Sequence, residues 1–301
     1  MTENDSLKDV QEHEEYLKAK DGTQVFMRSW LPQEIEHVVF AVHGQCAHSG
    51  TYRRMALAWS EQKIGTFGID LRGYGNTGTR GDAGAFHLVF EDITMALSEV
   101  QARYPGVPVS LLGWSMGVAM ILNTFGQCEL DPSTVILIAG RVKAAESVRD
   151  MLSGPAFVAK SFFVRDARFD FWSRSPKAMR ECELGQLVAE DELCTKQVSK
   201  RMLLEMGNFM SGKRILQGAA RVGVPTLIIH GEDDTTNPPE GSRQVYENLT
   251  VSQKRLVMIP DMEHDLDDLG VYKGPGLHKP LTPNAARVID EIVAWLQADH
   301  A

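Results

Sequence analysis

The pentapeptide Gly113-Trp114-Ser115-Met116-Gly117 is the part of the sequence whose residue types and spacing point most directly to chemistry. Small residues two positions before and two positions after a serine allow a sharp turn between a strand and a helix, which exposes the hydroxyl at the end of a sheet. The flanking sequence agrees, because the apolar run Val109–Leu112 precedes the motif and the helix-like Val118–Phe125 follows it. We therefore predict that Ser115 is a nucleophile.

A serine hydroxyl is a weak nucleophile until a neighbouring base takes its proton. Of the nine histidines, His264 fits this role best, because it follows the apolar run Leu256–Ile259 and completes the chain order serine, acid, histidine. His278, in a late loop rich in glycine and proline, is the rival candidate. We predict His264 as the base.

The base needs a buried carboxylate that fixes its tautomer and stabilises its charged form. Three candidates, Glu232, Asp233 and Asp234, follow the apolar run Thr226–Ile229. Adjacent side chains in a turn point in different directions, so only one of them should face His264. Spacing alone does not identify which one.

An acyl-transfer reaction also needs N–H donors placed in advance for the developing oxyanion. The residue after the nucleophile, Met116, supplies one donor, and the loop after an earlier strand supplies the other. That loop, His43-Gly44-Gln45, follows the apolar run Val38–Val42, and we predict the Gln45 N–H as the second donor. Glycine lets a backbone approach a substrate closely, so we place Gly44, with His43, among the substrate-binding residues.

These residues must be positioned by strands that end at one edge of a sheet. Short apolar, β-branched runs predict strands that are buried on both faces, and segments with helical periodicity lie between several of them. Alternation of this kind predicts an α/β fold, with a mostly parallel central sheet and helices on both faces. The predicted strands are Tyr16–Ala19, Gln24–Trp30, Val38–Val42, Thr66–Ile69, Val109–Leu112, Val135–Ile138, Thr226–Ile229 and Leu256–Ile259; the clearest helices are Phe90–Tyr104 and Val288–Leu296.

Residues 141–221 interrupt this alternation with a segment that has no buried-strand run and is rich in aromatic residues and methionines. A compact domain rarely contains a structureless loop of this length, so we predict an inserted helical cap or lid. Residues 1–140 and 222–301 then form the core, with residues 1–15 as a flexible tail. The aromatic residues either form the cap's own core or line an apolar substrate pocket, for which Phe157 and Phe162 are the candidates.

Five motifs taken together resemble one branch of a known superfamily. The motifs are His43–Tyr52, Asp70–Gly75, Gly113–Gly117, Gly231–Asp234 and Glu263–His264, and their order is similar to that of the monoacylglycerol lipase and lysophospholipase branch of the α/β-hydrolases. The resemblance covers about residues 16–299. It implies an α/β-hydrolase fold, Asp234 as the acid, Gln45 and Met116 as the oxyanion donors, a fatty acyl ester as substrate and no cofactor. The sequence departs from the family at Cys46-Ala47, where Gly-Glu is usual, and at Thr51, where arginine is usual.

The composition bears on compartment and partners. The net charge is −9, which argues against nucleic acid and anionic membrane surfaces as main partners. The polar N-terminus lacks the features of a signal peptide, and no apolar run approaches the ~20 residues that span a bilayer. The four cysteines have no metal-site spacing, so we expect reduced thiols, no metal and a cytoplasmic protein. Any contact with lipid aggregates should be transient and made through the cap.

The leading hypothesis is a serine hydrolase that cleaves acyl esters through an acyl-enzyme on Ser115. The same triad supports acyl transfer or perhydrolysis, which differ in the nucleophile that reaches the acyl-enzyme. A third hypothesis is a protein of another functional class, a non-catalytic ligand-binding protein on the same fold. It is disfavoured because a chemically competent residue fills every triad position.

Overall fold

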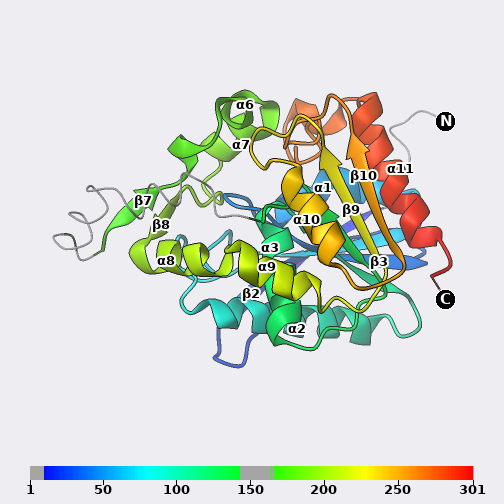
Figure 1. Cartoon of the computed structure of the whole chain (residues 1–301), viewed down its shortest axis with the longest axis horizontal. Coiled ribbons are helices and arrows are strands. Elements are labelled where there is room, and N and C mark those ends of the chain that lie inside the picture. Colours follow the sequence, from blue (N-terminus) through cyan, green and yellow to red (C-terminus); the bar gives the residue numbers. More distant parts are fainter. Residues whose placement is uncertain (1–9, 143–163, 165, 301) are drawn as a thin grey trace.

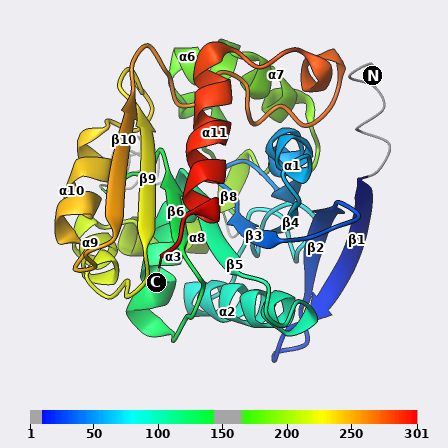
Figure 2. The same cartoon turned by 90° about the vertical axis from the view of Figure 1, so that its right-hand side faces the viewer.

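The computed structural model describes residues 10–142, 164 and 166–300. One eight-stranded sheet forms the centre of the molecule (Figure 1). Its strand order is β1-β2-β4-β3-β5-β6-β9-β10, which can be followed in Figure 2. Strand β2 runs antiparallel to β1 and β4, and all other neighbouring pairs in this sheet are parallel. The predicted α/β-hydrolase type of fold is therefore confirmed. The strands are β1 Gln11–Lys18, β2 Gln24–Leu31, β3 His37–Val42, β4 Ile64–Ile69, β5 Val109–Trp114, β6 Val135–Ile138, β9 Thr226–Gly231 and β10 Lys254–Ile259.

Helices cover both faces of the sheet (Figure 2). Side chains alternate across a strand, so Val38 and Phe40 of β3 pack into one hydrophobic cluster, whereas Val39 and Ala41 pack into the other. The first cluster contains buried residues of α2 (Phe86–Arg103), α3 (Met116–Gln127), α9 (Gly212–Ala219) and α10 (Glu240–Asn248). The second contains buried residues of α1 (Arg53–Ser60) and α11 (Pro283–Gln297). None of the helices that the structure describes is long and apolar enough to cross a membrane.

The first strand begins earlier than the sequence analysis expected. Residues 11–15, assigned there to a flexible tail, pair with residues 27–31 of β2. Their side chains are mostly exposed and polar, so the segment lacks the apolar pattern that predicts a strand. Ion pairs stabilise this edge instead: Glu14 contacts Arg28 at 2.6 Å and Glu15 contacts Arg103 at 2.5 Å.

The segment between β6 and β9 contains more than the expected short helices. Two three-residue strands, β7 (Arg168–Asp170) and β8 (Gln197–Ser199), form an antiparallel ribbon that is too short to be predicted from periodicity. The candidate pocket residues Phe157 and Phe162 lie outside the described residues. The other elements here are η3 Trp172–Arg174, α6 Lys177–Glu181, α7 Glu183–Glu190 and α8 Lys200–Phe209; elsewhere, η2 spans Ser49–Tyr52 and η4 spans Pro275–His278.

Helices α8 and α9 pack directly against the core. Phe209 of α8 stacks on Phe86 at a ring-centroid distance of 5.7 Å and meets Phe90 edge-on at 5.1 Å. A Cβ at Gly218 of α9 would lie 1.9 Å from the Leu122 carbonyl oxygen of α3, so glycine is required at this close crossing. The methionines of α8 thus join a cluster shared with α2 and α3. The division of the chain into core and cap stays a prediction.

Candidate active site

Ser115 lies in the sharp turn between β5 and α3. Its φ of 57° and ψ of −115° are unusual for a residue with a side chain, and such backbone strain is typical of functional sites. The two glycines of the motif make the turn possible. A Cβ at Gly117 would lie 2.0 Å from the Val42 carbonyl oxygen, and one at Gly113 would lie 2.7 Å from Ile121 Cδ1.

The structure brings the predicted nucleophile, base and acid together. His264 Nε2 lies 2.9 Å from Ser115 Oγ, and His264 Nδ1 lies 2.7 Å from Asp234 Oδ2. Asp234 follows β9 and His264 follows β10, so parallel neighbours deliver both residues to the same edge of the sheet. Asp233 is exposed, and the rival base His278 ends η4. Asp234, which the resemblance implied, is therefore the acid that faces His264.

Four N–H groups surround the Asp234 carboxylate. Its Oδ2 accepts a hydrogen bond from His264 Nδ1–H and lies 3.1 Å from His230 Nε2. Its Oδ1 accepts from the Asn237 and Thr236 backbone N–H groups at 2.6 and 2.9 Å. Burial alone would raise the pKa of this carboxyl, but the nearby His264 and these hydrogen bonds hold the pKa well below its ordinary value. These contacts therefore favour the ionised form of Asp234.

Asn237 and His230 are site residues that the sequence analysis missed. Asn237 Nδ2 donates to the Ala139 carbonyl oxygen at 2.8 Å and lies 3.4 Å from Ser115 Oγ, which links the acid's turn to the nucleophile. His230 is the next-to-last residue of β9. The sequence signal that could have identified His230 was its position just before the acidic turn. The last residues of parallel strands lie at the edge of the sheet where the site forms.

His43 supports the loop that carries Gln45 through contacts with two backbone groups, and its role in substrate binding stays a prediction. Its side chain is fully buried, its Nε2 accepts from the Leu71 N–H at 3.0 Å, and its Nδ1–H donates to the Gly44 carbonyl oxygen at 2.8 Å. Burial lowers its pKa to about 4, although the Asp70 carboxylate opposes this shift. The neutral ring thus satisfies two backbone groups and fixes the turn after β3.

Gly44 and Met116 lie next to Ser115, and Gln45 follows Gly44 in the chain. A Cβ at Gly44 would lie 3.2 Å from Ser115 Cβ, so the loop backbone passes close to the nucleophile. Met116 begins α3, and the N–H of a first helical residue has no acceptor within its helix. The Tyr74 hydroxyl donates to Gln45 Oε1 at 2.5 Å and lies 3.5 Å from Met116 Sδ, which ties the two donor residues together. The Gln45 and Met116 N–H groups stay the predicted oxyanion donors.

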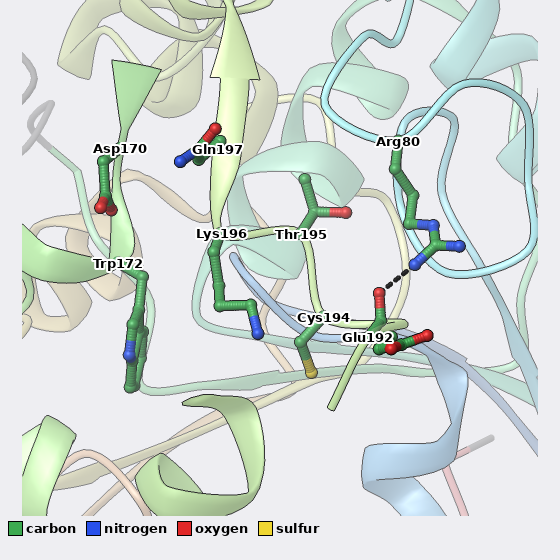
Figure 3. Close-up of a pocket in the computed structure, with 8 residues that line it drawn as sticks. All are labelled: Arg80, Asp170, Trp172, Glu192, Cys194, Thr195, Lys196 and Gln197. Atoms are coloured by element: carbon green, nitrogen blue, oxygen red, sulfur yellow. Dashed lines mark hydrogen bonds between the residues drawn. The ribbon is translucent and has the colours of Figure 1, made fainter. Parts of the chain in front are cut away.

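Two cavities are lined partly by residues between β6 and β9. One, of about 200 Å³, is lined by His264 and by Ala178 and Met179 of α6, so α6 lies close to the predicted base. The larger, of about 430 Å³, is lined by Arg80 and by residues of the β7–β8 region, among them Lys196 and Trp172 (Figure 3). Its lining mixes charges of both signs and does not include Ser115.

Within the described residues, one group of side chains has the composition of a metal site. The ligand atoms of Cys182, Asp265 and Asp268 lie within 4.8 Å of one another. Burial, reinforced by the Asp265 carboxylate, raises the pKa of the Cys182 thiol to about 12, so the thiol stays protonated.

A mostly parallel sheet, a serine at a strand–helix turn, and an acid and a histidine after later strands together define an α/β-hydrolase. Comparison with known families agrees and is more specific. The model of the family described as "Serine aminopeptidase, S33" matches residues 33–267, and the chain belongs to this family.

Known relatives cover nearly the whole chain. A monoglyceride lipase homolog of Monkeypox virus is 32% identical over 286 residues, 92% of this chain and 95% of the relative. The human monoglyceride lipase is 25% identical over 283 residues, 93% of this chain and 89% of the relative. Among solved structures, a monoglyceride lipase of Saccharomyces cerevisiae has a TM-score of 0.70 at 21% identity, and the match covers 95% of this chain and 94% of that one. The predicted resemblance to monoacylglycerol lipases is confirmed.

Proposed function

We propose that this protein hydrolyses carboxylic esters of fatty acids, with Ser115 as nucleophile, His264 as base and Asp234 as the orienting acid. The single observation that carries the proposal is the continuous hydrogen-bonded chain from Ser115 Oγ through His264 to Asp234, with links of 2.9 and 2.7 Å. Family membership and relatives named as monoglyceride lipases support ester hydrolysis as the reaction.

The geometry supports a two-step reaction. His264 Nε2 takes the hydroxyl proton while Ser115 Oγ attacks the acyl carbon, and the Gln45 and Met116 N–H groups stabilise the oxyanion. The protonated His264 then gives its proton to the leaving alcohol, which leaves an acyl-enzyme. Water, deprotonated by His264, attacks the acyl carbon and releases the fatty acid and Ser115. Asp234 stabilises the imidazolium in both steps.

The first test uses the nucleophile itself. Ser115→Ala should lower kcat of ester hydrolysis by about 10⁴-fold or more, because triad members act as a unit. The variant should unfold at the same denaturant concentration as wild type. A fluorophosphonate probe should label wild type at Ser115 alone. Labelling of another residue, or substantial activity in the folded alanine variant, would contradict the assignment of Ser115. A wild type without esterase activity would instead favour the ligand-binding alternative.

The second test concerns the acyl chain. Burial of a chain gains about 0.8 kcal/mol per CH₂, so kcat/KM should rise about fourfold per methylene from acetyl to medium-length p-nitrophenyl esters and then level off. Phe157→Gln or Phe162→Gln should flatten that rise, with acetyl ester turnover nearly unchanged, where either ring lines the pocket. A wild type that prefers acetyl esters would refute the fatty acyl assignment. Glycerol added as an acceptor distinguishes hydrolysis from acyl transfer.

A further inference from the structure

His230 is a buried histidine at the end of β9 whose position calls for an explanation. Its parity along the strand is that of Ile228, which packs into the cluster shared with α10, whereas Ile229 faces the opposite cluster. An apolar residue would pack there at no electrostatic cost. A fully buried imidazole is tolerated only when its polar atoms have partners.

Each ring nitrogen of His230 has such a partner, and the partners determine its tautomer. Nδ1 lies 2.6 Å from Ser242 Oγ, whose hydroxyl can donate to it. Nε2 lies 2.8 Å from the Asn237 carbonyl oxygen and 3.1 Å from Asp234 Oδ2, and both of these atoms only accept. The neutral ring with its hydrogen on Nε2 therefore satisfies every contact, with one N–H shared between the two oxygens.

The shared N–H completes the set of hydrogen bonds around the Asp234 carboxylate. An ionised carboxylate offers about four lone-pair directions, and Asp234 uses two of them on the backbone of its own turn and one on His264. His230 occupies the fourth, on the same oxygen that faces His264. Without it, Oδ2 has only the donor of His264, and one of the four hydrogen bonds that fix the orientation of the carboxylate is lost.

We infer that His230 is a positioning residue of the catalytic triad. It holds the Asp234 carboxylate in the orientation that accepts His264 Nδ1–H, and it holds the 234–237 turn that brings Asn237 to Ser115. His230 acts only through other residues and touches no reacting atom. The inference deepens the proposed function and rests on it for its kinetic consequence, but its geometric content does not depend on the substrate.

The kinetic test compares an apolar variant with one that keeps a donor. His230→Leu should lower kcat about 10- to 100-fold with KM unchanged, a loss of the size seen when the hydrogen-bond partner that orients a metal-binding side chain is removed. His230→Gln carries an amide N–H and should recover most of that loss. The matched control is His37→Leu. His37 is a buried histidine hydrogen-bonded to Ser110 Oγ at 2.9 Å, and it begins β3, so it lies at the amino ends of the parallel strands, away from the site. The control should lose stability and keep its kcat.

Measurements on the hydrogen bonds themselves keep the inference testable should His230→Leu not fold. In wild type, ¹⁵N–¹H NMR of the imidazole side chains should show His230 protonated at Nε2. A downfield proton between Asp234 and His264 should be present in wild type and in His230→Gln, and shifted or lost in His230→Leu. An Nδ1-protonated His230, or a folded His230→Leu with unchanged kcat, would overturn the inference. A wild type without esterase activity would refute the proposed function but not the inference about His230, because the NMR measurements do not depend on esterase activity.

Discussion

At the residue scale, three histidines around the site show that the group facing each nitrogen decides what an imidazole does. His43 has both nitrogens engaged by backbone groups and supports a loop. His230 has both engaged as well, and one of them contacts the triad acid. His264 has Asp234 on one side and Ser115 on the other, so it is the only one of the three placed to move a proton to and from the nucleophile.

The same reasoning separates two adjacent acids. Asp234→Asn should lower kcat/KM by about 10⁴-fold, because an amide in place of the carboxylate favours the wrong histidine tautomer. Asp233 is exposed, so Asp233→Asn should retain most of the activity. Steady-state kinetics of both variants, with circular dichroism as the folding control, provide the measurement. A larger loss of activity in Asp233→Asn would show that Asp233, and not Asp234, is the triad acid.

At the scale of elements, the strand–turn–helix unit depends on how closely α3 approaches β3. Gly117 sits where this approach is tightest, with the Val42 carbonyl 2.0 Å from any added Cβ. Val42 precedes the loop that carries Gln45. The same glycine therefore sets the packing of α3 and the separation of the two predicted oxyanion donors.

Two glycine-to-alanine variants in α3 test this point. Gly117→Ala should lower the free energy of unfolding by about 3 kcal/mol, since the added methyl group forces backbone to move. It should also lower kcat. Gly126→Ala lies in the same helix, but its nearest neighbour, Gly218 Cα, is 3.9 Å from the added Cβ. It should be neutral or stabilise by up to about 1 kcal/mol. Urea unfolding of both variants gives the comparison, and equal losses would contradict the close-approach argument.

At the scale of the whole molecule, burial of neutral histidines couples stability to pH. Burial is the main cause that lowers the pKa of His37 and of His43 to about 4, from the ordinary 6.5. In the unfolded chain both rings return to the ordinary value. Between about pH 6.5 and 4 the unfolded chain thus binds more protons than the native protein, so stability falls as pH falls.

The His37→Leu variant tests this linkage. Each histidine contributes up to about 1.4 kcal/mol per pH unit to the slope of stability against pH in that window. Removal of His37 should reduce the slope by that amount, and the slope above the ordinary histidine pKa should not change. Urea unfolding at several pH values measures both slopes. An unchanged slope below pH 6.5 would contradict the prediction that burial keeps His37 neutral in the native protein.

Much of the fold could be predicted from the sequence because it is encoded locally. Apolar runs marked the strands of the parallel sheet, and periodicity marked α2 and α11. The glycine pattern around Ser115 located the nucleophile, because the sharp turn needs those small residues at those two positions. Residues 11–15 of β1 escaped prediction, since this exposed part of an edge strand is stabilised by backbone pairing and ion pairs and lacks an apolar pattern.

The tertiary structure alone decided which groups face one another. Ser115 and His264 are 149 positions apart, and only the pairing of β5, β6, β9 and β10 places them within 2.9 Å. The spacing of Glu232, Asp233 and Asp234 could not single out the acid, because the direction of each side chain depends on how the turn packs against the next strand. The roles of His43, His230 and Tyr74 were hidden for the same reason. A residue's type limits what chemistry it can do, and its three-dimensional neighbours determine which of those roles it performs.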